Sequence, residues 1–220
     1  MNYFIDTNIP LGYVIIHDKH HPTAKEFLEK NKNKLFWSNL VKKEYSIKFL
    51  KILDLIETFL DMVKHILKNN CNSFKNYIQF EKFILEKTKF CNLDRFKKCK
   101  ILEHFWKTNL YNFKNQELYN IFSQFTNTFD KIYFTRDLHL NQILTLHNCG
   151  LNNYLKYIKY AEKLYDWGVH NPDCKIITDA HDCGLLNDNL TFITIDMKML
   201  KKIIGKNVSF LKIKEFKSLN

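Results

Sequence analysis

The sequence predicts an α/β protein in which a parallel sheet is flanked by helices and interrupted by a large all-helical insertion. Short apolar runs typical of strands occur near both ends of the chain and alternate with segments of helical periodicity. The middle of the chain shows helical periodicity alone. The 220 residues include only 5 Gly and 3 Pro, a composition that favours long helices with short connections.

The N-terminal part, residues 1–69, is expected to begin with a strand that feeds a helix. The apolar run at residues 3–5 stops at Asp6, and the polar residues and proline that follow are typical of a helix start. A second helix is predicted at HPTAKEFLEKN and a second strand at KLFWSN. A long amphipathic helix then begins at Leu40 and carries Glu44 in its first turns.

Residues 70–164 are expected to form the helical insertion, which would cover or extend the functional edge of the sheet. This segment is rich in aromatic residues at helical spacing, which favours core packing or a dimer interface. Stacking of these rings on nucleic-acid bases is the alternative. The aromatic positions expected to be buried are Phe74, Tyr77, Phe83, Phe105, Trp106, Tyr119, Phe122, Phe125 and Phe129.

The C-terminal part, residues 165–220, is expected to complete the sheet by pairing with residues 1–48. The pattern predicts a helix over about 173–186, a strand at TFITID, a short helix from Met197 to Ile204 and a last strand at VSFLKI. Strands and helices in this order imply a parallel sheet with helices on both faces. In such sheets, functional residues collect at the carboxyl ends of the strands.

Four carboxylates are predicted to meet at that edge. Asp6 and Asp196 each follow an apolar strand, whereas Glu44 and Asp173 lie near the starts of helices that face the same edge. Crowded carboxylates repel one another and lose solvation, so they are tolerated where a cation neutralises them. Hard oxygen ligands select Mg²⁺ or Mn²⁺, and such ions promote hydrolysis of phosphodiesters. The sequence therefore predicts a divalent-metal site.

These motifs together resemble the PIN-domain nucleases, a family that includes VapC-type toxins and nucleases that process ribosomal RNA. The resemblance covers YFIDTN, Glu44 in LVKKEY, Asp173 in PDCKIITDAHDCG and Asp196 in TFITIDMKML. After the third acid, the family has an apolar residue, an alanine and often a glycine at positions that match Ile176, Ala180 and Gly184. The resemblance spans little more than half of the chain and leaves the insertion uncovered.

The resemblance implies a PIN-like, Rossmannoid domain with metal-dependent endoribonuclease activity on single-stranded or structured RNA. The four acids would hold one or two Mg²⁺ or Mn²⁺ ions, and hydrolysis would leave a 5′-phosphate and a 3′-hydroxyl. A toxin role, with an antitoxin protein as partner, and a homodimer are further expectations from the family. The rival functions are a DNA or flap nuclease on the same fold and a catalytically silent scaffold that binds RNA or a protein partner.

Each acid taken alone also has a structural interpretation. Asp6 could cap a helix, Glu44 could lie on a solvated helix face, and Asp173 could complement a helix dipole. Asp179 lies about 240° round an ideal helix from Asp173, so we expect at most an outer-shell contact with the metal. Asp182 is expected to face solvent.

One further acid and two histidines are also candidates for the site. Asp137 in KIYFTRD imitates the last acid of the family, but Asp196 is preferred because the pattern of Asp173 precedes it and a predicted strand follows. His170 and His181 could touch a phosphate or orient a ligand, although a lone histidine near a helix is more often a surface or cap residue.

The charge of the chain favours a phosphate-rich partner. Lys and Arg number 34 against 23 Asp and Glu, a formal net charge of +11, although A/T-rich codon usage alone could raise the lysine content. Candidate RNA-contacting stretches are RFKKCK at 95–100, KNKNK at 30–34, and Lys201 with Lys202.

Six cysteines lack a CxxC pair, and no signal peptide or membrane span is predicted, so a cytoplasmic location is expected.

Overall fold

The computed structural model describes residues 1–69, 74–108 and 117–219, which form two compact units. The first unit comprises residues 1–14, 20–48 and 137–220, and the second comprises residues 15–19 and 49–136. The expected insertion, residues 70–164, therefore overlaps the second unit as far as residue 136, while its remainder belongs to the first unit.

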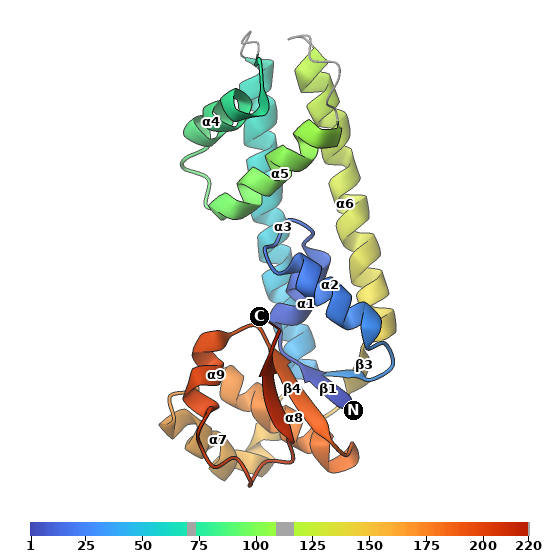
Figure 1. Ribbon diagram of the computed structural model, residues 1–220, viewed down its shortest axis with the longest axis vertical. Helices are drawn as coiled ribbons and strands as arrows, with labels where there is room; N and C mark the ends of the chain where they lie inside the picture. Colours follow the sequence, from blue (N-terminus) through green and yellow to red (C-terminus); the bar gives the residue numbers. More distant parts are fainter. Residues whose placement is uncertain (70–73, 109–116, 220) are drawn as a thin grey trace. The chain divides into compact units, whose positions relative to one another are not determined.

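The first unit is built on a five-stranded, all-parallel sheet of order β3-β2-β1-β4-β5 (Figure 1). Its strands are β1 (Asn2–Ile5), β2 (Leu35–Ser38), β3 (Thr145–His147), β4 (Leu190–Thr194) and β5 (Glu215–Ser218). β1 lies beside β4 with Ile5 opposite Ile193, although nearly the whole chain separates them. The predicted pairing of residues 1–48 with residues 165–220 is confirmed.

Helices cover both faces of the sheet. All five residues of β4 are buried, and because successive side chains of a strand point to opposite faces, neither face is open to solvent there. The helices of this unit are α1 (Asn8–Val14), α2 (His21–Lys30), α7 (Ile158–Asp166), α8 (Asp173–Leu186) and α9 (Met197–Ile203), with a 3₁₀ helix, η1 (Asn153–Tyr157), before α7. The predicted bounds of α8 agree with the structure.

The last predicted strand is wrong. Residues 208–213 form turns and bends, and the edge strand β5 begins at Glu215. The backbone N–H groups of this segment bond elsewhere: Leu211 donates to the Val208 carbonyl, and Lys212 donates to Nδ1 of His181 at 2.9 Å. The apolar Leu211 and Ile213 are buried, so the alternating pattern reflects burial and not strand pairing.

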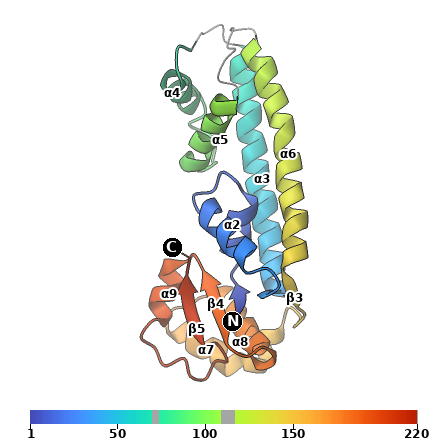
Figure 2. The same cartoon turned by 45° about the vertical axis from the view of Figure 1, so that its right-hand side comes forward.

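The second unit is helical and has an aromatic core. It contains most of α3 (Asn39–Lys68) and α6 (Glu117–Ile143), together with α4 (Tyr77–Lys87) and α5 (Arg95–Thr108) (Figure 2). The rings of Phe105 and Phe122 meet edge to face with centroids 4.8 Å apart, as do those of Phe125 and Phe129. Core packing is thereby confirmed for these four rings.

The expectation that residues 70–164 are wholly helical is wrong at β3. This three-residue strand, Thr145–His147, pairs with β2 in parallel and forms one edge of the sheet. It is too short to carry a period-two signal, so the flanking helical pattern concealed it. Asp137, the acid that imitates the last family motif, lies in α6 and accepts a hydrogen bond from the Tyr45 hydroxyl at 2.7 Å. Asp196, by contrast, follows β4, as predicted.

Candidate active site

Asp6 is anchored at the carboxyl end of β1. Its N–H donates to the Ile193 carbonyl at 2.9 Å, which extends the pairing of β1 with β4 by one residue. Its Oδ1 accepts the backbone N–H of Thr7 at 2.7 Å, and its Oδ2 accepts the hydroxyl of Thr194 at 2.7 Å. The residue is only 4% exposed, so these bonds replace much of the lost hydration.

Asp196 follows β4 and has a structural role as well. Its Oδ1 accepts the backbone N–H groups of Lys198 at 2.8 Å and Met199 at 3.0 Å, so it is the N-cap of α9. Its own N–H donates to the hydroxyl of Thr194 at 2.9 Å. Thr194 therefore links the two strand-end acids, because it donates to Asp6 and accepts from Asp196.

Glu44 reaches the same edge from α3. Its Oε2 accepts the hydroxyl of Thr7 at 2.7 Å, and its Oε1 pairs with the ammonium of Lys48, one turn further along the helix, at 2.6 Å. Thr7 thus joins Asp6 to Glu44, through its N–H on one side and its hydroxyl on the other. The interpretation of Glu44 as a solvated helix face is wrong.

Asp173 is the first residue of α8 and is partly buried. Burial raises the pKa of its carboxyl, and the carboxylates of Asp196 and Glu44 raise it further. The ammonium groups of Lys48 and Lys202 act in the opposite direction. Within the described residues, its carboxylate accepts no hydrogen bond, which leaves both oxygens available for a ligand.

The four acids, Asp6, Glu44, Asp173 and Asp196, form what we call the carboxylate cluster. Burial raises the pKa of Asp6 to about 6, the hydrogen bonds from Thr194 and Thr7 oppose this rise, and the charges of Asp173 and Glu44 add to it. Hydrogen bonds through Thr7 and Thr194 connect Asp6 to Glu44 and to Asp196, and the charges of Glu44 and Asp196 act on Asp173. The four acids therefore lie at the carboxyl edge of β1 and β4.

The donor atoms of the carboxylate cluster suit Mg²⁺ or Mn²⁺, but they do not form a closed cage. In the part of the chain that the structure describes, no three His, Cys, Asp or Glu side chains are grouped closely enough to hold one ion. Mg²⁺ keeps several waters and is commonly held by one or two carboxylates, so an open set of oxygens fits a hydrated ion. Asp173, with both oxygens available, is best placed to contact such an ion.

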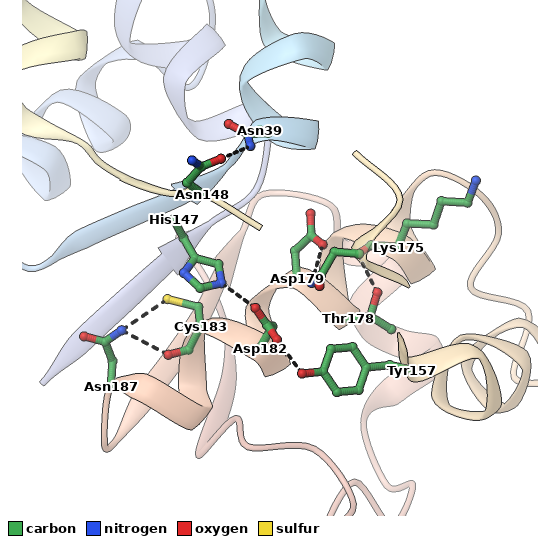
Figure 3. A network of polar contacts seen from close by, with 11 residues as sticks. Asn39, His147, Asn148, Tyr157, Lys175, Thr178, Asp179, Asp182, Cys183 and Asn187 are labelled. Carbon is green, nitrogen blue, oxygen red and sulfur yellow. Dashed lines mark hydrogen bonds and ion pairs between the residues drawn. The ribbon is translucent and has the colours of Figure 1, made fainter. Parts of the chain in front are cut away.

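Asp179 and Asp182 belong to a different group of side chains on α8. Figure 3 shows Asp182 between His147 and Tyr157; it accepts from Nε2 of His147 at 2.8 Å and from the Tyr157 hydroxyl. The expectation that Asp182 faces solvent is therefore wrong. Asp179 is 2% exposed and accepts the side-chain amide of Asn153 at 3.2 Å.

The neighbours of Asp179 lie on the β2 and β3 side of the sheet. Burial raises its pKa, whereas contacts from Ser38, the last residue of β2, and from Asn153 lower it. None of the main causes of this shift is a member of the carboxylate cluster. An outer-shell contact of Asp179 with a metal in the carboxylate cluster therefore has no support in these contacts.

Sequence reasoning missed the groups that position the acids. Thr7 and Thr194 connect the acids by hydrogen bonds, and Lys48 with Lys202 reduces their repulsion. Lys48 could have been found from its spacing, since it lies four residues after Glu44 on a predicted helix. The roles of the threonines depend on the orientation of their hydroxyls, for which the sequence carries no signal.

Comparison with protein-family models, with curated proteins and with solved structures found no match to this chain. The fold defines the class: an α/β protein with a five-stranded parallel sheet flanked by helices and an appended helical unit. Among the described helices, none has both the length and the apolar character needed to cross a bilayer. All five described cysteines are free, and Cys71 lies outside the described residues.

Proposed function

We propose that this protein is a PIN-like nuclease that uses Mg²⁺ or Mn²⁺ to hydrolyse phosphodiester bonds in RNA. The observation that carries the proposal is the carboxylate cluster, in which acids that follow β1 and β4 or lie in α3 and α8 are placed at one edge, and the neighbouring acids raise the pKa of Asp6 and of Asp173. Neither helix capping nor dipole compensation explains why four such groups should meet. Their order and their places on strands and helices agree with the resemblance to PIN-domain nucleases.

The acids of the cluster and the lysines beside them would have different roles in the reaction. Asp6 and Asp173 would hold the ion, with Asp6 fixed by Thr7 and Thr194 and with Asp173 free to turn towards it. When bound, a divalent ion lowers the pKa of a coordinated water and stabilises the charge on phosphate oxygens. Lys48 and Lys202 would contact the phosphate backbone, which the bare carboxylates would repel.

Cleavage assays on the pure full-length protein test this proposal. We expect Mn²⁺-dependent cleavage of single-stranded RNA that leaves 5′-phosphate ends, and at least about a 100-fold loss of rate in Asp6→Asn and in Asp173→Asn, since each removes charge from the ion site. The matched control is Asp188→Asn, because Asp188 is an exposed acid outside the cluster. If both cluster variants cut RNA as fast as the parent, the proposal is wrong.

One observation favours a second candidate, a catalytically silent scaffold. Lys48 already neutralises Glu44, and Asp196 already caps α9, so two of the four acids have structural partners. A silent site should show no saturable heat of Mn²⁺ binding in calorimetry, whereas the nuclease should bind Mn²⁺ and lose this binding in Asp6→Asn. The antitoxin partner, the homodimer, the DNA or flap alternative and the cytoplasmic location stay predictions.

A further inference from the structure

The second unit has a cavity of about 600 Å³ beside the segment that joins α4 to α5. The two helices pack through the rings of Phe80, Phe105 and Trp106, and residues 88–94 connect them. A volume of this size is typical of small-ligand pockets and can admit part of a flexible polymer. Charged groups at the cavity are Glu81, Lys82, Glu86, Lys89, Arg95 and Lys98.

The cations at this cavity are not neutralised by the acids. Lys98 is 6% exposed, and its ammonium donates to the backbone carbonyls of Thr88 at 3.0 Å and Cys91 at 2.8 Å. These bonds use two of the three N–H groups of the ammonium, which also lies 5.8 Å from the centroid of the Phe59 ring. Within the described residues, Lys89 and Arg95 are exposed and form no ion pair, which leaves an excess of positive charge at this surface.

Two phenylalanines that are sequence neighbours of cavity-lining residues are exposed: Phe90 follows Lys89, and Phe96 follows Arg95. Phe90 is 82% exposed and Phe96 is 41% exposed. A lysine ammonium lies near each ring: that of Lys89 is 4.9 Å from the centroid of Phe90, and that of Lys100, which pairs with Glu103 at 2.7 Å, is 5.7 Å from the centroid of Phe96. An exposed ring with a cation beside it suits a nucleotide, because the base can stack on the ring and the phosphate can pair with the cation.

We propose that the surface formed by Lys89 and Arg95, which line the cavity, and by the adjoining exposed residues Phe90 and Phe96 binds single-stranded RNA. Bases stack on Phe90 and Phe96, and phosphates contact Lys89 and Arg95. Single strands fit because their bases are free to stack, whereas a duplex hides its base faces. The choice of RNA rests on the proposed function; the binding surface itself does not depend on cleavage.

The charge pattern distinguishes RNA from a basic protein partner. Glu81 accepts a hydrogen bond from the Tyr77 hydroxyl at 2.5 Å, but Glu86 is exposed at the cavity and has no ion pair within the described residues. Loss of the Glu86 charge should therefore tighten the binding of a polyanion and weaken the binding of a cation. Glu86→Gln tests which sign of ligand this surface takes.

The test measures binding of a labelled oligouridylate of about 15 nucleotides by fluorescence anisotropy, since sites of this kind span roughly 4 to 16 nucleotides. The protein is the full-length Asp6→Asn variant in EDTA, so that the strand stays intact. Phe90→Ala should weaken binding about 10-fold through the loss of one stacked base, while Phe90→Trp should retain it. The double variant Lys89→Gln with Arg95→Gln should lower the slope of log Kd against log salt concentration by about 1.4, the value expected for the loss of two phosphate contacts.

The matched control is Phe134→Ala, which removes a phenylalanine that is 51% exposed on α6 of the same unit. It should leave the affinity unchanged, and circular dichroism should show native helix content in each variant because the mutated rings are exposed. If Phe90→Ala binds as tightly as the parent, or if Glu86→Gln weakens binding, the RNA surface is overturned.

Cleavage assays separate this proposal from that of nuclease activity. An intact protein that binds oligouridylate through Phe90 but never cuts it with Mn²⁺ supports the surface and refutes the nuclease. A protein that cuts RNA while Phe90→Ala leaves binding intact refutes the surface and supports the nuclease.

Discussion

The buried carboxylate of Asp6 lowers the stability of the folded protein at neutral pH. The residue is 4% exposed, and burial together with neighbouring acids raises its pKa to about 6, although two strong hydrogen bonds oppose the shift. The charged form is therefore less stable in the folded protein than in the unfolded chain. Asp6 lowers the stability of the fold at neutral pH, which is typical of residues kept for a function.

The pH dependence of stability follows from the raised pKa of Asp6. Between the unfolded pKa of 3.8 and the folded pKa of about 6, the folded state binds more protons, so the contribution of Asp6 to stability is present at low pH and is lost as the pH rises through this window. In metal-free buffer, Asp6→Asn should remove this decline and stabilise the protein at pH 7 by about 1 to 3 kcal/mol.

Urea unfolding of the parent and of Asp6→Asn at pH 4 and pH 7, in EDTA, would measure this effect. Asp188→Asn is the control, because its exposed carboxyl should leave the pH profile close to that of the parent. An Asp6→Asn variant that is less stable than the parent at pH 7 would contradict the assignment of a costly charge.

At the scale of elements, α8 links the carboxylate cluster to the edge of the sheet. Its first residue, Asp173, belongs to the cluster, and its later residues lie against residues 211–213, which lead into β5. The contact requires a glycine: a Cβ on Gly184 would lie 1.9 Å from the carbonyl oxygen of Lys212. Gly184, which matches a glycine position in the PIN-domain resemblance, therefore has a packing role in this protein.

Gly184→Ala should destabilise the first unit by about 1 to 3 kcal/mol, because the added methyl must displace backbone and not a flexible side chain. The higher helix propensity of alanine offsets at most about 1 kcal/mol of this cost. Leu185→Ala, at an exposed neighbour on α8, should change the free energy of unfolding by less than about 0.5 kcal/mol. Equal stability of the two variants in urea would show that the close contact is absent.

At the scale of the whole molecule, the chain combines a parallel-sheet unit that holds the acids with a helical unit that presents cations and exposed rings. The charged residues of this chain, whose net charge is +11, are unevenly distributed. Carboxylates are concentrated at one sheet edge, whereas Lys89 and Arg95 lie at the cavity of the second unit without an ion pair among the described residues. The proposed nuclease function would use both features, since acids would hold the ion and cations would hold the phosphate backbone.

The proposed function requires divalent ions to bind the folded carboxylate cluster and not the unfolded chain, so it predicts that they stabilise the protein. At a Mn²⁺ concentration about 100 times its Kd, the gain is about 2.7 kcal/mol. Thermal unfolding should therefore shift upwards with Mn²⁺ in the parent and stay fixed in Asp6→Asn.

Lys48→Gln provides a second test of the same linkage. It frees Glu44 from its ion pair and removes a competing cation, so the Mn²⁺-dependent shift should be larger at equal metal concentration. In the comparison of the parent with Asp6→Asn, a Mn²⁺-dependent shift in unfolding temperature of the same size in both proteins would place the ion elsewhere.

Short-range patterns were enough to predict most of the elements and the position of each acid. The apolar run that ends at Asp6, the helix that starts at Asp173 and the strand before Asp196 are visible in sequence because burial imposes a period on the residues of each element. The same reasoning missed β3 and misplaced the last strand, since three residues carry no period and Leu211 and Ile213 are buried without strand pairing.

The sequence by itself determined the α/β class, the parallel pairing of the two ends of the chain and the elements on which the four acids lie, because these depend on hydrophobic periodicity and on the rule that parallel strands end at one edge. Only the tertiary structure decided how those acids are held, by Thr7, Thr194 and Lys48, and which aromatic rings stay outside the core. Hydrogen-bond directions and the exposure of single rings arise from contacts between residues far apart in the chain, and no local pattern encodes them.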